Sequence, residues 1–170
     1  GDMFMKSLGH QRGMGMIEIL VALLILAIGI LGFIALQYRA LEASAESTSR
    51  VQAITLARDL AERMRVNRNS LTVYNQQLQD ASKQTDYAKN CFQNNCTDTE
   101  LADFDVAQVV KSASSYGMTM NMIACPQTNN RQCIYIAWGD TSATNGPGVG
   151  DCTQDTSYNN NSTCVIMEAY

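Results

Sequence analysis

The chain has 170 residues, a formal net charge of −4 and a sequence pI near 4.9. This acidic balance gives no support to a nucleic-acid-binding surface. The length suits one globular domain and a long anchor helix, and an apolar segment near the N-terminus accounts for much of the 46% hydrophobic content, because the distal half is rich in Asn, Gln, Ser and Thr.

Residues 1–13 form a short basic segment that contains Lys6, His10 and Arg12 against a single acidic residue. Positive charges that flank a membrane segment stay in the cytoplasm. We therefore expect this end to face the cytoplasm and the chain after Leu36 to face the periplasm.

The next segment is long and apolar. From Ile19 to Leu36 it has 18 residues without a charged or amide side chain, which is enough for a helix to cross the roughly 30 Å hydrocarbon core of a bilayer. Glu18 stands at the start of this run, and Gly13 lies five residues before it. A carboxylate in lipid is costly, so an acid at this position indicates a function that requires a partner.

Gly13, Glu18 and the run MIEILVALLILAIGILG resemble the type IV prepilin (class III) signal, and the run is similar to the PilV branch of minor pilins. In that family a peptidase cuts after the Gly that ends the leader, and the fifth residue of the mature chain is Glu. The resemblance implies cleavage between Gly13 and Met14, N-methylation of Met14 and an assembly role for Glu18. Met14 stands where the family usually has Phe, and Gly15 where it has Thr or Ser.

Two other interpretations of the apolar run are open. A secretory signal peptide has a shorter apolar core of about 7–15 residues followed by a small-x-small cleavage site. Residues 43–45 (Ala-Ser-Ala) offer such a site, but the run is too long and begins with an acid. An uncleaved signal anchor explains the length of the run and leaves Glu18 without a reason.

The helical pattern continues beyond the apolar run. No Pro or Gly occurs from Gln37 to Asn67, and apolar residues recur at helical spacing at Ala53, Leu56, Ala57, Leu60 and Met64. We predict one helix from about Met16 to Val66, about 75 Å long. Its second half would pack its apolar stripe on a domain. Ala35 stands where major pilins often carry Pro, so we expect no break there.

The remaining chain predicts a small α+β head. Residues after Asn67 as far as 100 show no clear period, and a helix is expected from Leu101 to Ser115, capped by Thr97 or Asp98. Strands are expected at 117–124, 134–138 and 165–170, with a hairpin loop at 126–132 and a long connection at 139–163. The fold class is then α+β and pilin-like, with an antiparallel sheet packed on the long helix.

This organisation divides the chain into four parts: a leader (1–13), a transmembrane and assembly half of the helix (14–36), its soluble half (37–67) and a disulfide-stapled head (68–170).

All six cysteines lie in the head, and an even number of them indicates disulfides in an oxidising compartment such as the periplasm. Cys91 and Cys96 are close enough in sequence for a local loop. Cys125 and Cys133 flank the expected hairpin, which leaves Cys152 to pair with Cys164. The last four cysteines allow three connectivities, so the two other arrangements stay open.

The sequence predicts no catalytic site, cofactor or metal centre. The only histidine, His10, lies in the leader, and no nucleophile motif, phosphate loop or zinc spacing is present. Asp140, Asp151 and Asp155 fall in the long connection but lack the spacing of a calcium-binding loop.

The resemblance therefore implies a structural minor pilin, not an enzyme. It would lie in the inner membrane as a single-pass protein with its head in the periplasm, and then in the extracellular pilus. The implied partners are other minor and major pilins, the prepilin peptidase and the inner-membrane assembly platform, with no nucleic acid. The implied role is in a tip or priming complex for pilus assembly, twitching motility and adhesion. The alternatives are a minor pseudopilin of type II secretion and, less favoured by the acidic charge, a pilin-like DNA-uptake subunit.

Overall fold

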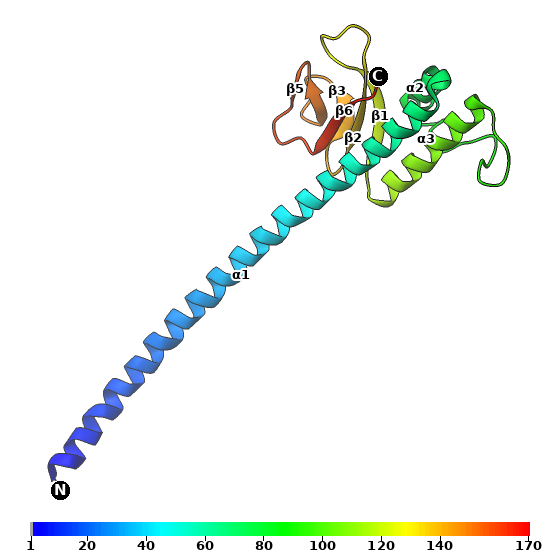
Figure 1. The fold of residues 1–170 in the computed structure, drawn as a ribbon. Coiled ribbons are helices and arrows are strands. Elements are labelled where there is room, and N and C mark those ends of the chain that lie inside the picture. Colours follow the sequence, from blue (N-terminus) through cyan, green and yellow to red (C-terminus); the bar gives the residue numbers. More distant parts are fainter. Residues whose placement is uncertain (1) are drawn as a thin grey trace. The chain divides into compact units, whose positions relative to one another are not determined.

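The computed structural model describes the backbone of residues 2–170 and the side chains of residues 15–170. It divides into two compact units, Gly1–Glu46 and Ser47–Tyr170. Helix α1 spans Asp2–Val66 and contributes to both units (Figure 1). Each unit is described by itself.

In the N-terminal unit the described chain is helical throughout, including Gly29, Gly32 and Ala35. The absence of a break at Ala35 agrees with the sequence. The side chains of Ile19 to Leu36 are all exposed within this single chain. Such a helix closes its own backbone hydrogen bonds while its apolar side chains face outward, which is what lipid requires of a spanning segment.

The distal unit begins with the rest of α1 and continues through three further helical elements: the 3-10 turn η1 (Arg68–Ser70), α2 (Leu71–Gln79) and α3 (Asp98–Ser115). The predicted end of α1 at Val66 and the helix predicted at 101–115 are confirmed. The expected apolar stripe of α1 is also confirmed, because its five members are no more than 6% exposed. Helix α2 was not predicted, and its presence corrects the expectation of an irregular segment after Asn67.

One antiparallel sheet, in the order β1-β2-β6, packs against these helices: β1 (Thr119–Ala124), β2 (Gln132–Ala137) and β6 (Cys164–Glu168). Its strands lie within two residues of the predicted bounds. Met118, Met120 and Met122 are buried together with Ile134 and Ile136 in the core that the helices cover, as the alternation of the sequence indicated. The predicted α+β fold, a long helix packed on a small antiparallel sheet, is thus confirmed.

A second small sheet occupies the segment that was expected to be a long connection. It contains β3 (Ser142–Asn145), β4 (Asp151–Gln154) and β5 (Ser157–Tyr158), with β3 parallel to β4 and β4 antiparallel to β5. Tyr135 and Ala137 of β2 are buried with Ala143 and Cys152 from this sheet. The distal unit therefore has helices on one face of the β1-β2-β6 sheet and the small sheet on the other.

Three disulfides tie the head together, and they join the same pairs that the sequence suggested: Cys91 with Cys96, Cys125 with Cys133, and Cys152 with Cys164. The second closes the β1–β2 hairpin. The third joins β4 to β6, so it connects the two sheets covalently.

Candidate membrane and assembly site

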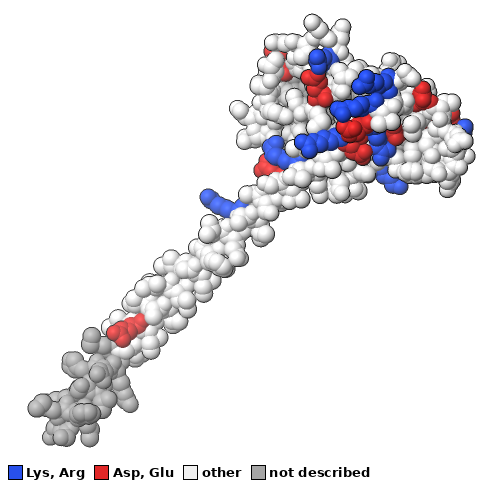
Figure 2. Space-filling view, viewed as in Figure 1, with Lys and Arg blue, Asp and Glu red and all other residues white. Residues whose placement is uncertain are grey.

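The N-terminal part of α1 has the length and composition of a membrane span. Among the described residues, one helix, Gly15–Val66, contains a window that is long and apolar enough to cross a bilayer, and none of that window is buried. Figure 2 shows the corresponding surface as uncharged apart from an acidic side chain near its start, whereas charged side chains gather over the distal unit.

Glu18 is the acidic residue at the start of the apolar run, and its side chain is exposed. It forms no ion pair with another described residue, and the next charged residue along the chain is Arg39. Residues 14 and 18 are four apart, so they share one face of a helix. The side chains of Gly13 and Met14 lie outside the described residues, and cleavage, methylation and a role for Glu18 remain predictions.

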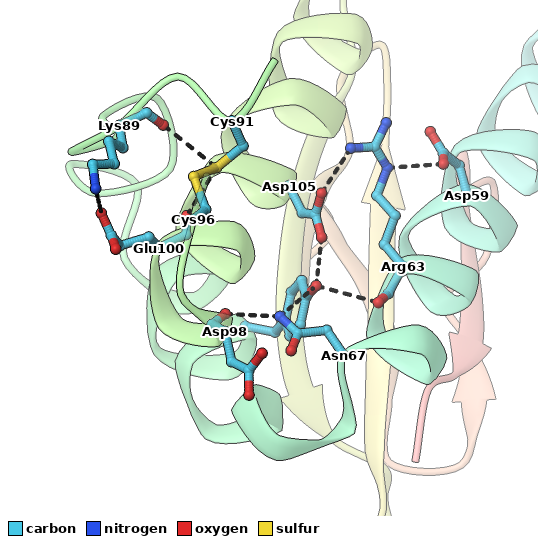
Figure 3. Close-up of polar contacts among 10 residues, drawn as sticks. Asp59, Arg63, Asn67, Lys89, Cys91, Cys96, Asp98, Glu100 and Asp105 are labelled. Carbon is cyan, nitrogen blue, oxygen red and sulfur yellow. Dashed lines mark hydrogen bonds and ion pairs between the residues drawn. A yellow bond between two sulfur atoms is a disulfide. The ribbon is translucent and has the colours of Figure 1, made fainter. Parts of the chain in front are cut away.

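A partly buried polar cluster in the distal unit holds the last turns of α1 to α2 and α3 (Figure 3). Arg63 of α1 lies between two carboxylates, with Nε 3.0 Å from Asp59 Oδ1 and Nη1 2.9 Å from Asp105 Oδ1. The Tyr74 hydroxyl of α2 donates to Asp105 Oδ2 at 2.5 Å. One carboxylate on α3 therefore receives hydrogen bonds from both other helices.

The same cluster ends α1. Asn67, the first residue after the helix, is buried, and its Nδ2 donates to the carbonyl oxygen of Asp98 at 2.7 Å. The Arg63 carbonyl, in the last turn of α1, accepts from the Asn67 amide at 3.1 Å and also lies 3.2 Å from the Tyr74 hydroxyl. The chain can therefore turn away from α1 without leaving buried polar groups unsatisfied.

The surroundings shift the protonation equilibria of this cluster. Burial raises the pKa of Tyr74, and the hydrogen bond to Asp105 raises it further. For Arg63, burial lowers the pKa, but the hydrogen bonds to Asp59 and Asp105 outweigh it and the pKa is raised. Both shifts favour a protonated tyrosine and a charged arginine. The cluster is therefore suited to holding the three helices together.

The Cys91–Cys96 loop leads directly into α3. Thr97 caps the helix by accepting from the Glu100 amide, while the Glu100 carboxylate accepts from the Thr97 amide in a capping box. These hydrogen bonds from Thr97 lower the pKa of Glu100, with a smaller contribution from Lys89, which lies 3.3 Å away. The prediction that Thr97 or Asp98 caps this helix is resolved in favour of Thr97.

No calcium site is formed by the aspartates of the long connection. In the described part of the chain, no group of three or more His, Cys, Asp or Glu side chains is arranged to hold a metal ion. The Asp151 carboxylate instead accepts from the Gly148 amide and the Thr144 hydroxyl, and Asp155 accepts from Gln127.

Only one half of the polar cluster has a local signal in the sequence. Asp59 and Arg63 are four residues apart, a spacing at which an acid and a base of one helix can pair, and the structure contains this ion pair. Asp105 is 42 residues from Arg63, and a polar residue in the buried face of α3 was the only local signal for it. Asp105 is 6% exposed, and a carboxylate so buried requires paired partners.

Comparisons with known proteins identify two adjoining regions of the chain. Residues 35–107 match the family model described as type IV pilin Tt1218, and residues 8–34 match that of the prokaryotic N-terminal methylation motif. Residues 35–107 are thus similar to a type IV pilin domain of the Tt1218 kind, and the residues before them are similar to a class III prepilin methylation motif. The type IV pilin family of this match consists of structural proteins and not of enzymes. No curated protein and no solved structure matches the chain.

Proposed function

We propose that this protein is a PilV-like minor pilin of the type IV pilus. In this proposal segment 14–36 holds the precursor in the inner membrane with the head (68–170) in the periplasm. The prepilin peptidase cuts after Gly13, Met14 is methylated, and the mature chain joins other minor and major pilins at the assembly platform. The observation that carries the proposal is the lone carboxylate of Glu18 on an exposed apolar helix that directly precedes a type IV pilin domain.

The chemistry of Glu18 supports an assembly role. A charge in lipid is costly, so a retained carboxylate needs a partner in another state. Cleavage after Gly13 creates such a partner, the α-amine of Met14. In surroundings of low dielectric constant a carboxylate and a protonated amine attract each other strongly, and either charge without the other is unfavourable. Glu18 of an incoming subunit would therefore neutralise the amine of a subunit already in the filament, which fixes the register between them.

The processing step can be tested by mass spectrometry and one substitution. We expect the mature chain to begin at methylated Met14 and Gly13→Val to leave a full-length, unassembled precursor in the membrane. Gly15→Val is the matched control and should be cut normally, because a Cβ at position 15 meets no other atom within 4 Å. A mature N-terminus after Ala45 would instead show that the segment is a secretory signal.

The type of fibre can be tested by deleting the gene. We expect loss of surface pili and twitching motility with normal protein secretion, as befits a member of a pilus priming or tip complex. A secretion defect with normal piliation would show a type II pseudopilin instead, because both classes share the leader and the anchor.

A further inference from the structure

A groove of about 670 Å³ lies in the distal unit, between the end of α1 and the C-terminal strand. Its wall on the helical side comes from the last turns of α1, from η1 and from the start of α2, and its other wall comes from β6 and the two residues after it. The lining residues that matter here are Arg58, Met64, Arg65, Arg68, Met167 and Glu168.

The groove runs along a free sheet edge. Strand β6 is the last in the order β1-β2-β6. Ala169 N donates toward β2, to Gln132 O, whereas Ile166 N donates away from β2, to the Tyr158 hydroxyl. Because neighbouring residues of a strand point their backbone groups to opposite sides, Glu168 N–H and C=O also face away from β2. Neither group has a hydrogen bond to another described element.

No residue of β1 or β2 lines the groove. The groove therefore borders the outer edge of β6 together with the face that α1 covers, and an added chain would lie along that edge. An extended segment placed in it would run beside Glu168, over the half-buried apolar side chains of Leu71 and Met167. An unpaired edge next to a preformed groove is the arrangement that strand-addition sites use.

The charged residues that line the groove determine which kind of peptide segment it would prefer. Arg65 pairs with Glu62, with Nη1 3.3 Å from Oε1, and Glu168 pairs with Arg131. Arg58 and Arg68 also line the groove, and neither forms an ion pair within residues 15–170. Figure 2 shows basic and acidic side chains interspersed over this part of the distal unit on the visible face. Two unbalanced arginines beside a strand edge favour carboxylates.

We propose that this groove binds an extended segment of a partner protein, which adds to β6 as a further strand and places acidic side chains against Arg58 and Arg68. The backbone of β6 would supply hydrogen bonds independent of sequence, and the two arginines would supply the preference for acidic side chains. This site is separate from Glu18, so it stands whether or not the pilus proposal holds.

The experiment uses the full chain in detergent micelles and a labelled six-residue peptide of alternating Val and Glu, which matches a typical strand length of about 5–6 residues. Fluorescence anisotropy measures binding, and hydrogen exchange measures protection of the Glu168 amide. We expect binding, slower exchange at that amide, and weaker binding of two control peptides. One control alternates Val and Lys, and the other has backbone N-methyl groups that remove its donors.

Two substitutions at one position separate the backbone from the side chain. Glu168→Pro removes the outward N–H, which an edge strand tolerates, and we expect about tenfold weaker binding, the effect of one lost hydrogen bond. Glu168→Ala keeps the N–H and should bind the peptide at least as well as wild type, because it also removes an acidic side chain. Equal binding by the Pro and Ala variants would overturn strand addition.

Charge reversal tests the preference for acids. Arg58→Glu and Arg68→Glu should each weaken binding by about fivefold, as expected for an exposed charge pair, and Lys111→Glu on the exposed face of α3 should leave it unchanged. Failure of the Val/Glu peptide to bind overturns the proposal. Binding of anionic lipid vesicles that requires both arginines but is unaffected by Glu168→Pro would also overturn it and assign the arginines to a lipid surface.

Discussion

Arg63 contacts two carboxylates that differ in their surroundings. The Asp59 side chain is 46% exposed, whereas that of Asp105 is 9% exposed. An exposed ion pair is screened by water and contributes little, but a buried carboxylate that loses its charge leaves its donors without a partner. Asp105 also accepts from Tyr74. The hydrogen-bond distances to Arg63 are alike, so burial and the second donor decide which pair matters.

We predict that Asp105→Asn lowers the free energy of unfolding of the head by about 2–3 kcal/mol, because Arg63 and Tyr74 lose a charged acceptor. Asp59→Asn is the matched control on the same arginine and should cost less than about 1 kcal/mol. Chemical denaturation can be followed by the fluorescence of Trp138, the single tryptophan, which packs against the core of the distal unit. Equal losses in the two variants would contradict the ranking.

Among the helices and strands, the long segments with a regular apolar period were predictable from the sequence, and the short ones were not. The end of α1 and residues 101–115 of α3 follow from apolar spacing within one segment, whereas the first turn of α3 was not included in the prediction. Helix α2 also has a local signal, since Tyr74 and Leu78 are four residues apart and buried. The helix has only nine residues, however, and two apolar positions among polar residues are too few to establish a helical period.

The second sheet was missed for a different physical reason. Its strands have two to four residues, and short strands in a Gly- and Asn-rich segment carry almost no alternation. Their order depends on contacts that a local pattern cannot show, such as the Thr153 hydroxyl, which lies 2.8 Å from the Tyr135 hydroxyl of β2. The cysteines were the better guide, because pairing Cys125 with Cys133 left Cys152 to pair with Cys164, and this bond joins β4 to β6.

The Thr97 cap at the N-terminus of α3 can be tested by substitution. We predict that Thr97→Ala lowers the free energy of unfolding by about 1 kcal/mol, because the Glu100 amide loses its acceptor. Thr99→Ala, an exposed position in the first turn of α3, has no such contact and should change stability by less than about 0.5 kcal/mol. The same Trp138 denaturation curve measures both, and a Thr99 effect as large as that of Thr97 would contradict the cap.

The disulfide between the sheets offers a second test. Replacing Cys152 and Cys164 together by Ser should lower the free energy of unfolding by about 2–4 kcal/mol, since the bond restricts the unfolded chain. Peptide mapping without reduction should recover Cys152 joined to Cys164 and Cys125 joined to Cys133. Recovery of Cys125 joined to either of the other two would overturn the pairing on which this prediction depends.

The two units of the chain differ in their surfaces and in their cores. The N-terminal unit is almost free of charge between Glu18 and Arg39, and its exposed apolar side chains need lipid or other helices around them. The distal unit has its own buried core, three disulfides and most of the charged side chains. Under the proposed function both demands would apply in turn, because the same apolar surface would lie in a bilayer before assembly and against other subunits afterwards. Glu18 would then be the charged residue that moves between these two environments.

We predict that Glu18→Ala and Glu18→Gln are inserted and processed but fail to join the pilus. Removing the charge makes insertion easier, so the defect should appear only after cleavage, when the Met14 amine would be left without its carboxylate in a low-dielectric interface. Glu42→Ala is the matched control, because it removes an exposed acid of α1 beyond the apolar run and should assemble normally. Membrane fractionation, mass spectrometry of the N-terminus and isolation of sheared pili separate the three steps. Wild-type piliation and recovery with the other pilins in Glu18→Ala would show that the carboxylate has no docking role, whereas a precursor that accumulates uncut would move its role to recognition by the peptidase.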